Sequence, residues 1–492
     1  MSVQKALDFA LISSNNPNNL EYNNTKIFLK RFSYPSYNND QFLVAFIALF
    51  PIIIILSFSF VVILTAKAIV QEKESGLKEA MKLMGMKTWI YWLSWYIKTF
   101  VMLLPSLIFI AISYKIELTL PKGEMSAILN RTDPFLFFLF MILQASSLIT
   151  FIFMCTTFFK KSNSAATGTG IIYFLTYLPF IYVSIRYEFI DFPIKLVFCL
   201  INNIAICTGI QLFGMFEATN DGLNFSNWSE GINITDNLSL LHVMLMLLVN
   251  HVIHLLLTYY FENIFPGDHG IAKPWYFPIN CLRRKHKINS NDKNNIEMIR
   301  KKINDNDNIH SQIFIEDESI YSTRNIGIKI NNIVKIFKQL GTIKKAVQNL
   351  TLNIYEGQIS VLLGHNGAGK STTISMITGL CEPTSGNILI NNNDIVENTN
   401  EARSVLGYCP QHNLLFDDLT VYEHLKLFSK LKQNYNENEI NNMLDLINLT
   451  DKKHALSKTL SGGMKRKLSV AIAFIGGSKI VILDEPSNYL FI

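Results

Sequence analysis

Apolar residues are concentrated in the first 265 positions of the chain, in six runs that are long enough, or nearly long enough, to cross a lipid bilayer. A membrane-spanning helix needs about 20 apolar residues, and the cores of soluble domains rarely contain stretches such as LVAFIALFPIIIILSFSFVVIL. The pattern therefore predicts a helical membrane domain over residues 42–265. The six runs are Phe42–Ala66, Trp92–Tyr114, Phe135–Phe159, Gly168–Ile185, Leu196–Met215 and Leu238–Phe261.

After the last apolar run the pattern changes twice. From Cys281 to about Asn325 the chain is rich in Asn, Lys, Asp and Ile, with too little apolar surface to fold alone. From Ile326 onward, short β-rich runs alternate with helical stretches, which is typical of an α/β domain. The predicted organisation is therefore an N-terminal segment 1–41, a membrane domain 42–265, a cytosolic linker 266–325 and an α/β domain 326–492.

The α/β domain contains a glycine-rich motif that predicts a phosphate-binding loop. GHNGAGKST at residues 364–372 fits G-x-x-x-x-G-K-[ST], follows the strand-like ISVLL and precedes the helical TTISMITGL. The glycines let backbone N–H groups turn toward phosphates at a helix N-terminus. Lys370 would reach the β- and γ-phosphates, and Ser371 would offer its hydroxyl to Mg²⁺. The residues expected to contact the nucleotide are Gly364, His365, Asn366, Gly367, Ala368, Gly369, Lys370, Ser371 and Thr372.

A second motif supplies the acidic half of a nucleotide site. In KIVILDE at residues 479–485, a run of buried aliphatic residues delivers Asp484 to the end of a strand, where it would help to hold the metal. Glu485 could act as a general base or orient the attacking water. An aliphatic strand that ends in two acids is weak evidence for a metal site by itself. It becomes strong evidence here because a phosphate-binding loop lies upstream in the same domain. The expected cofactors are ATP and Mg²⁺.

The membrane topology is predicted from whether the number of crossings is odd or even. A nucleotide-binding domain must face the cytosol, and the segment Lys67–Lys87 carries five lysines, which also favours the cytosol. The first and last runs then both pass from outside to inside, so six full crossings are impossible. Leu196–Met215 contains polar residues that would be costly in lipid but are tolerable inside protein. We therefore expect five spans and a re-entrant hairpin near 196–215, with Phe216–Asn237 outside the cell.

The cytosolic segment after the first run predicts a charged helix over residues 72–87. Glu74 and Lys78 are four residues apart, a spacing that favours an ion pair along a helix, and three apolar residues form another face. This arrangement suits docking against a soluble domain, and a helix lying on the membrane surface is the alternative. The apolar face consists of Leu77, Met81 and Met84.

Two histidines of the last run, His251 and His254, share one helix face at a spacing that metal ligands also use. No carboxylate or third ligand accompanies them. We therefore expect them to pack or to form hydrogen bonds inside the helical bundle.

Composition narrows the class of protein. Hydrophobic residues make up 49% of the 492 positions, and charged residues only 17%. This balance is too apolar for an ordinary soluble protein of this length. The net charge of +6 is modest and gives no case for nucleic-acid binding. Six cysteines without a C-x-x-C pair indicate neither a zinc site nor a disulfide framework.

The segment between the two nucleotide motifs resembles a known family. LSGGMKRKLS at 460–469 is similar to the signature of ATP-binding cassette proteins, and YCPQHNLLFDDLT resembles their glutamine loop. IVQEKESGLKEAMKLMGMKTWIYWLSWYIK at 69–98 resembles the cytosolic coupling hairpin of the A subfamily, the lipid-transporting group. ENIFPGDHGIAKPWYFP at 262–278 resembles the exit of that subfamily from its last span.

This resemblance implies roles for further residues. The signature residues would contact ATP bound to the opposite nucleotide domain. Gln411 would sense the γ-phosphate, contribute to the metal site and touch the membrane domain, and Phe337 would stack on adenine. The implied metal set is Ser371, Gln411 and Asp484, and the implied signature contacts are Leu460, Ser461, Gly462 and Gly463. The implied function is transmembrane transport, of lipids or other hydrophobic substrates, driven by MgATP binding and hydrolysis.

The resemblance covers nearly the whole chain but only the middle of the family's plan, which has two membrane domains and two nucleotide domains. Residues 1–41 resemble the last stretch of an external domain, and SNYLFI after Pro486 lacks the aspartate loop and the histidine that the family uses next. We therefore expect a multi-pass helical membrane domain followed by an incomplete α/β P-loop NTPase domain of the ABC type. The expected partner is a second ABC half. The alternative is a truncated membrane protein that at most binds ATP without turnover.

Overall fold

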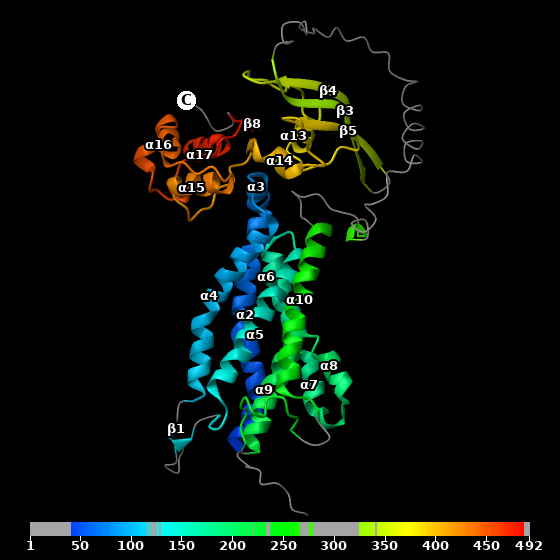
Figure 1. Cartoon of the computed structure of the whole chain (residues 1–492), viewed down its shortest axis with the longest axis vertical. Coiled ribbons are helices and arrows are strands. Elements are labelled where there is room, and N and C mark those ends of the chain that lie inside the picture. Colours follow the sequence, from blue (N-terminus) through cyan, green and yellow to red (C-terminus); the bar gives the residue numbers. More distant parts are fainter. Residues whose placement is uncertain are drawn as a thin grey trace, which may run out of the picture.

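The computed structural model describes residues 41–115, 118–119, 125–126, 129–219, 221–232, 237–265, 275–278, 324–339 and 342–486. The predicted N-terminal segment 1–41, apart from its last residue, and most of the predicted linker 266–325 lie outside these described residues. A helical bundle and a nucleotide domain follow one another along the long axis of the molecule (Figure 1).

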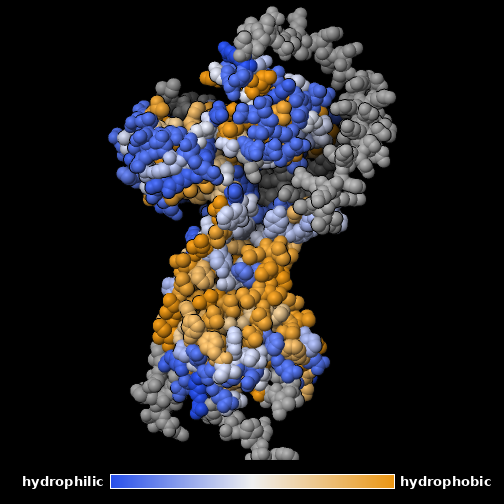
Figure 2. Space-filling model, in the orientation of Figure 1, coloured by the Kyte–Doolittle hydropathy of each residue, from blue (hydrophilic) through white to orange (hydrophobic). Residues whose placement is uncertain are grey.

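Five helical segments among the described residues are long and apolar enough to cross a membrane. Large apolar side chains such as Phe60, Met102 and Phe109 are exposed on them, as lipid-facing positions require. Figure 2 shows the resulting hydrophobic band across one face of the bundle, with more hydrophilic surface on either side of it along the long axis. The segments are α2 (Gln41–Glu74), α4 (Thr88–Ser113), α5 (Pro134–Thr157), α6 (Ser162–Leu175) continued by α7 (Leu178–Ile185), and α10 (Leu240–Ile264).

The predicted run Gly168–Ile185 is part of a longer segment that begins at Ser162 and is interrupted between α6 and α7. Pro179 lies in the first turn of α7, where its missing N–H is tolerated. A proline at this point cannot continue the hydrogen bonds of α6, so the helix is broken although the apolar pattern continues.

The element predicted near 196–215 folds as two helices, α8 (Phe192–Phe198) and α9 (Asn202–Ala218), at the end of the bundle away from the nucleotide domain (Figure 1). Helix α9 is buried against α2, α5 and α10. A Cβ at Gly209 would lie 2.5 Å from the ring of Phe140, so only glycine allows α5 this close. This burial is what a re-entrant hairpin requires, and its depth in a bilayer stays a prediction.

The same end of the bundle carries three short elements. β1 (Leu118–Thr119) pairs antiparallel with β2 (Met125–Ser126), and the 3-10 helix η2 (Tyr187–Phe189) follows α7.

The predicted helix over 72–87 is wrong as a single element. Gly76 adopts a left-handed backbone conformation (φ 79°) and separates α2 from the short helix α3 (Leu77–Leu83). The expected pair between Glu74 and Lys78 is not formed, because this turn redirects the two side chains. Glu74 instead accepts a 2.8 Å hydrogen bond from the backbone N–H of Ser162.

Helix α3 contacts the nucleotide domain rather than lying alone on a membrane surface. It packs near β7 (Leu406–Cys409), and Figure 1 shows it between the bundle and that domain. A Cβ at Gly85, just after α3, would lie 3.2 Å from the carbonyl oxygen of Leu431. Met81 and Met84 are buried, as their predicted docking face requires.

The first part of the nucleotide domain is an antiparallel sheet of order β4-β3-β5-β6. Its strands alternate buried isoleucines with outward residues, the period of a half-buried sheet, and α13 (Lys370–Ile377) and α14 (Thr399–Ser404) accompany it. The strands are β3 (Ile326–Gln339), β4 (Thr342–Tyr355), β5 (Ser385–Ile390) and β6 (Asn393–Asp394), and the buried core includes Ile328, Ile330, Ile388 and Ile390.

The second part joins β7 to β8 (Ile480–Leu483) in a parallel pair. Helix α15 (Val421–Leu431) begins with a capping box formed by Thr420 and Glu423, which satisfies its first amides. The remaining elements are α16 (Glu437–Leu446), α17 (Gly462–Phe474) and the 3-10 helices η4 (Thr450–Lys452) and η5 (Ser457–Thr459).

The prediction of a strand at residues 359–363, before the phosphate-binding loop, is wrong for the described structure. No described strand pairs with this segment, and Ile359 and Leu363 are 95% and 84% exposed. A strand exists only where a neighbour takes up its backbone hydrogen bonds. Here β7 and β8 pair with each other instead.

Candidate functional site

The predicted phosphate-binding loop forms a turn that leads into α13. Gly367 and Gly369 both have positive φ, 88° and 90°, which side chains rarely adopt. A Cβ at Gly369 would lie 2.4 Å from the carbonyl oxygen of Ala346, whereas one at Gly367 would meet nothing within 4 Å. The loop is thus held tightly against β4 on one side and open on the other.

Lys370 curls back over this loop. Its Nζ donates to the carbonyl oxygen of Gly364 at 2.5 Å and to that of His365 at 3.1 Å. The lysine charge and the N-terminal end of α13 together make this open side favourable for an anion. Phosphate groups of a nucleotide therefore fit the residues present. Of the other predicted loop residues, His365, Asn366, Ala368 and Ser371 are exposed and Thr372 is half-buried.

The glutamine and the acidic pair come together at the ends of β7 and β8. The backbone N–H of Asp484 donates to the carbonyl oxygen of Cys409 at 2.9 Å, which continues the parallel pairing. The side-chain amide of Gln411 donates to Oε2 of Glu485 at 2.8 Å, across 74 positions of sequence. Glu485 has a φ of 47°, which turns the chain sharply after the strand.

The electrostatics of Asp484 connect the two halves of the site. Burial and the neighbouring Glu485 raise the pKa of Asp484, while Arg466 and Lys370 act in the opposite direction. Lys370 therefore lies within electrostatic range of Asp484. The charge of Lys370 thus links the predicted phosphate-binding loop to the acid that would hold a metal.

The donor set fits Mg²⁺ bound together with a nucleotide. The hydroxyl of Ser371, the carboxylate of Asp484 and the side-chain oxygen of Gln411 are the hard oxygen donors that Mg²⁺ prefers. Among the described residues, no group of three His, Cys, Asp or Glu could hold a metal ion alone. Mg²⁺ commonly uses one or two protein ligands and completes its shell with phosphate oxygens and water.

The predicted signature residues form the start of α17, apart from the phosphate-binding loop (Figure 1). The hydroxyl of Ser461 accepts a 3.3 Å hydrogen bond from the backbone N–H of Met464 and caps the helix. Ser461 and Gly462 are exposed, and a Cβ at Gly462 would meet nothing within 4 Å. Gly463 is half-buried and Leu460 is buried. The signature therefore faces outward.

Phe337 lies on β3 with 44% of its surface exposed. The Nζ of Lys335 lies 5.2 Å from its ring centroid. Among the described residues, Phe337 makes no hydrogen bond or ring contact with another predicted site residue. Its role toward adenine therefore stays a prediction.

Arg466 is a site residue that the sequence analysis missed. It is completely buried in α17 and donates to the backbone carbonyl oxygens of Gln411 and Glu485. Its position in the sequence could have revealed it, because Arg466 falls on the buried face of the amphipathic helix together with Ser469 and Ala473. A charged residue in such a stripe indicates a buried polar network.

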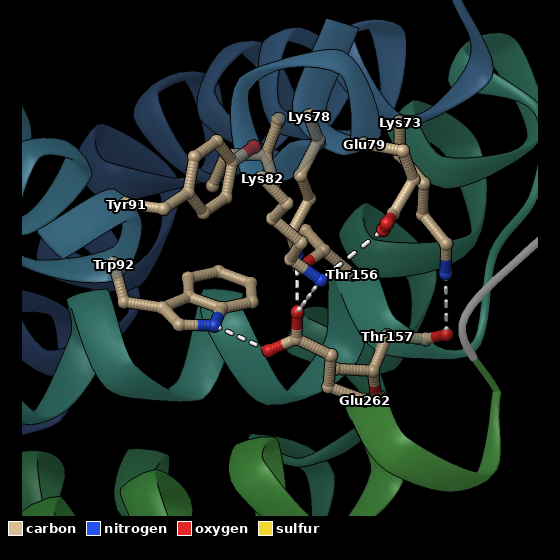
Figure 3. A pocket seen from close by; sticks show the side chains of 10 residues that line it. Lys73, Lys78, Glu79, Lys82, Tyr91, Trp92, Thr156, Thr157 and Glu262 are labelled. Carbon is tan, nitrogen blue, oxygen red and sulfur yellow. Dashed lines mark hydrogen bonds and ion pairs between the residues drawn. The ribbon is translucent and has the colours of Figure 1, made fainter. Parts of the chain in front are cut away.

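A cluster of charges at the junction between bundle and nucleotide domain was also missed (Figure 3). Lys78 and Lys82 of α3 pair with Oε1 of Glu262 at 2.8 and 3.2 Å, and Nε1 of Trp92 donates to Oε2 at 2.6 Å. The Nζ of Lys78 also lies 4.4 Å from the Trp92 ring centroid, a cation–π distance. A cavity of about 20 Å³ separates these side chains, room for about one water molecule.

Burial lowers the pKa of Lys78, and Glu262 opposes this shift. A charged lysine in this place therefore depends on the glutamate at the end of α10. The cluster ties the helix that contacts the nucleotide domain to the last apolar helix.

The two histidines of α10 pack inside the bundle, as predicted. Nδ1 of His251 lies 3.1 Å from the carbonyl oxygen of Ser146, and its ring meets Tyr96 edge-on. His254 is buried and meets the ring of Phe151 edge-on.

Comparison with known proteins places both parts of the chain. Residues 347–488 match the family model described as ABC transporter, and residues 2–260 match the one described as ABC-2 family transporter protein.

Three curated relatives illustrate the similarity. The phospholipid-transporting ATPase ABCA3 of Homo sapiens is 38% identical over 497 residues, covering 99% of this chain and 28% of that protein. ATP-binding cassette sub-family A member 2 of Rattus norvegicus is 36% identical, covering 94% and 19%. The retinal-specific phospholipid-transporting ATPase ABCA4 of Homo sapiens is 35% identical, covering 94% and 20%. The chain thus spans less than a third of the length of these relatives.

Among solved structures, the ATP-binding subunit of an ABC transporter is 28% identical, covering 33% of this chain and 67% of that chain, with a TM-score of 0.30. A dimeric bacterial ABC transporter cassette is 26% identical, covering 33% and 75%, also with a TM-score of 0.30.

Proposed function

The chain belongs to the ATP-binding cassette (ABC) transporters, with a membrane domain of the ABC-2 family, and we propose that it forms one half of an ATP-driven lipid transporter. The observation that carries this proposal is the hydrogen bond between Gln411 and Glu485, with Asp484 in electrostatic range of Lys370. These residue types are the ones that a phosphate-handling site needs, and they come from three separate segments of the chain.

Each side chain has a distinct part in this proposal. Lys370 and the amides at the start of α13 would hold the β- and γ-phosphates. Ser371, Asp484 and Gln411 would hold Mg²⁺, which when bound offsets charge on the transferred phosphoryl group. Glu485 would orient the attacking water and accept its proton. The hydrogen bond from Gln411 keeps the Glu485 carboxylate at the end of β8.

The exposed signature supports a second nucleotide domain as the partner. Ser461 and Gly462 are exposed, and Figure 1 shows α17 apart from α13, which follows the phosphate-binding loop. A nucleotide held by Lys370 would therefore be enclosed only when the signature of another domain covers it. The partner would be a second ABC half, either in the same polypeptide or in another chain.

Helix α3 would transmit motion to the membrane domain. It contacts β7, which leads directly to Gln411, and its Lys78 and Lys82 pair with Glu262 at the end of α10. A change at the γ-phosphate would thereby reach two apolar helices through short contacts. This relay requires the nucleotide domain on the cytosolic side, with five crossings and the α8–α9 hairpin toward the opposite face.

Lipids are proposed as the substrate because two of the similar proteins are named as phospholipid-transporting ATPases. The exposed apolar side chains of the five candidate spans suit a membrane, where such a substrate resides. A second candidate function is ATP binding without turnover by this chain alone. It is favoured by the separation of the signature from the phosphate-binding loop, because one chain then supplies only half of an enclosed site.

Reconstitution of the full chain in phospholipid vesicles tests the proposal. Glu485→Gln should leave nucleotide binding within about twofold of wild type and lower phosphate release by about 100-fold or more, the usual contribution of a general base. Lys452→Met, at an exposed position of η4 outside the predicted motifs, is the matched control. Unchanged phosphate release in Glu485→Gln would contradict the assigned role. Nucleotide binding without phosphate release in the wild-type chain would support the second candidate.

A further inference from the structure

Arg466 donates hydrogen bonds to two segments that lie far apart in sequence. Its guanidinium donates to the carbonyl oxygens of Pro410 (2.6 Å) and Gln411 (3.2 Å) after β7. It also donates to those of Asp484 (2.7 Å), Glu485 (2.7 Å) and Pro486 (3.1 Å) after β8. The side-chain oxygen of Asn413 completes the set at 3.4 Å.

Only arginine can make this set of contacts. Its planar fork carries five N–H donors, whereas lysine directs three donors from a single nitrogen. The side chain is completely buried, so its charge is balanced by these oxygens and by the nearby acids rather than by water. Arg466 also opposes the burial that raises the pKa of Asp484.

The same two residues are joined twice. The side chains of Gln411 and Glu485 bond to each other, and their backbone carbonyls accept from the same guanidinium. A displacement of either residue therefore pulls on Arg466. The end of the site that would sense the γ-phosphate is fixed by one side chain of α17.

Helix α17 also carries the signature. Arg466 is its fifth residue, and Ser461 caps its first turn. At 1.5 Å rise per residue, about 6 Å of rigid helix separates Arg466 from Gly462. Motion of the guanidinium is therefore passed to the exposed signature surface without any loop between them.

We propose that Arg466 is a positioning residue that couples the γ-phosphate end of this nucleotide site to the signature segment 460–463. Binding of ATP at the site draws Gln411 and Glu485 toward the phosphate, and Arg466 moves the start of α17 with them. The signature surface thus reports the occupancy of its own site to a second nucleotide domain. This inference rests on the proposed nucleotide site and adds communication between two such sites.

Hydrogen exchange of the full chain in vesicles tests this coupling, with azido-ATP photolabelling as an independent measure of binding. The variants are Arg466→Lys, which keeps the charge and loses the fork, and Arg466→Met. The matched control is Lys467→Met, which removes a positive charge from the next, half-buried position of α17. Exchange is followed in a peptide covering 460–464, with and without MgATP.

Wild type and Lys467→Met should show slower exchange of this peptide when MgATP is added. Arg466→Lys should be photolabelled within about twofold of wild type. The MgATP-dependent slowing of exchange in this peptide should nevertheless be at least fivefold smaller than in wild type. Hydrogen exchange across α15 and α16 without MgATP shows whether each variant is folded. If Arg466→Met does not fold, the result for Arg466→Lys alone tests the inference.

A wild-type response in Arg466→Lys would overturn the inference and leave the proposed function intact. So would normal photolabelling of wild type without any MgATP-dependent change at 460–464. A wild-type chain that is not photolabelled would overturn the proposed function itself, and the coupling with it.

Discussion

Lys78 of α3 and Glu262 in the last turn of α10 form an ion pair of 2.8 Å at the junction between the helical bundle and the nucleotide domain. Both side chains are nearly buried, 7% and 11% exposed. Lys82 bonds to the same carboxylate, so a single glutamate balances two lysines with the help of Glu79. The helix that contacts the nucleotide domain is therefore fixed to the last apolar helix by charge as well as by packing.

Removing the charge of Glu262 should destabilise this junction. Glu262→Gln leaves Lys78 and Lys82 close together without their shared counter-ion, and breaking a buried pair costs about 3 kcal/mol or more. Thermal unfolding of the detergent-solubilised chain measures the loss. Asp418→Asn is the control, because the exposed pair between Asp418 and Lys458 is worth less than about 1 kcal/mol. Equal melting temperatures for the two variants would show that the junction pair contributes no more than a surface pair.

Gly369→Ala should strongly weaken nucleotide binding. The new Cβ would lie 2.4 Å from the Ala346 carbonyl oxygen, and a positive φ of 90° adds about 1–2 kcal/mol of strain for alanine. The loop must therefore shift away from β4 and lose its anion-binding shape. We expect at least a tenfold loss of azido-ATP photolabelling.

Gly357→Ala is the matched control for that prediction. Gly357 also has a positive φ, 74°, but a Cβ there would meet nothing within 4 Å. It should therefore share the backbone strain without the collision and keep photolabelling within about twofold of wild type. Similar losses in both variants would mean that strain rather than the contact with Ala346 controls the loop.

Acidification should destabilise the nucleotide domain through His424. Nε2 of His424 accepts from the backbone N–H of Phe416 at 2.9 Å, and Nδ1 lies 2.8 Å from the Thr420 carbonyl oxygen, so only the neutral ring satisfies both contacts. Burial lowers the pKa of His424 below 6.5, although Thr420 opposes the shift. The unfolded chain then binds more protons below about pH 6.5, and stability present above that pH is lost as the pH falls through the folded pKa.

The melting temperature of the full chain between pH 5 and 8 measures this effect. His424→Gln should be less stable at pH 8 and should flatten the pH dependence below pH 6.5. The exposed His454→Gln should behave as wild type. An unchanged slope in His424→Gln would assign the acid sensitivity to other groups.

Thiol labelling tests the membrane topology. Glu230 and Lys87 are both exposed and lie at opposite ends of the bundle in the proposed topology. A membrane-impermeant maleimide should label Glu230→Cys on intact cells and Lys87→Cys only after permeabilisation, in a background with Cys281 and Cys381 replaced by Ser. Labelling of Glu230→Cys only after permeabilisation would contradict the five-crossing arrangement.

The spans and the nucleotide motifs were predictable because their signals are local. An apolar run of sufficient length specifies a membrane helix by itself, as in α4 and α10. The glycine pattern before Lys370 likewise predicts a tight turn, and the positive φ values at Gly367 and Gly369 agree with it. The proline that interrupts the segment 162–185 was visible in sequence, but hydrophobicity alone did not reveal the break.

Contacts between distant segments were not predictable in this way. The bond between Lys82 and Glu262 spans 180 positions, and no local pattern links the two. The strand predicted at 359–363 fails for the same reason, since a strand depends on a neighbour that may lie anywhere in the chain. The predicted pair of Glu74 with Lys78 fails because Gly76 ends the helix between them. The burial of Arg466 could be predicted from the pattern of its helix, but its hydrogen-bond partners are visible only in the three-dimensional structure.

The central claim is that the loop before Lys370 and the acids after β8 enclose one nucleotide. Azido-ATP photolabelling of Lys370→Ala in membranes tests it most directly, with Lys452→Ala, at an exposed position of η4, as the control. We predict that Lys370→Ala loses at least nine-tenths of the labelling and that Lys452→Ala keeps it. Undiminished labelling of Lys370→Ala at equal expression would contradict the claim.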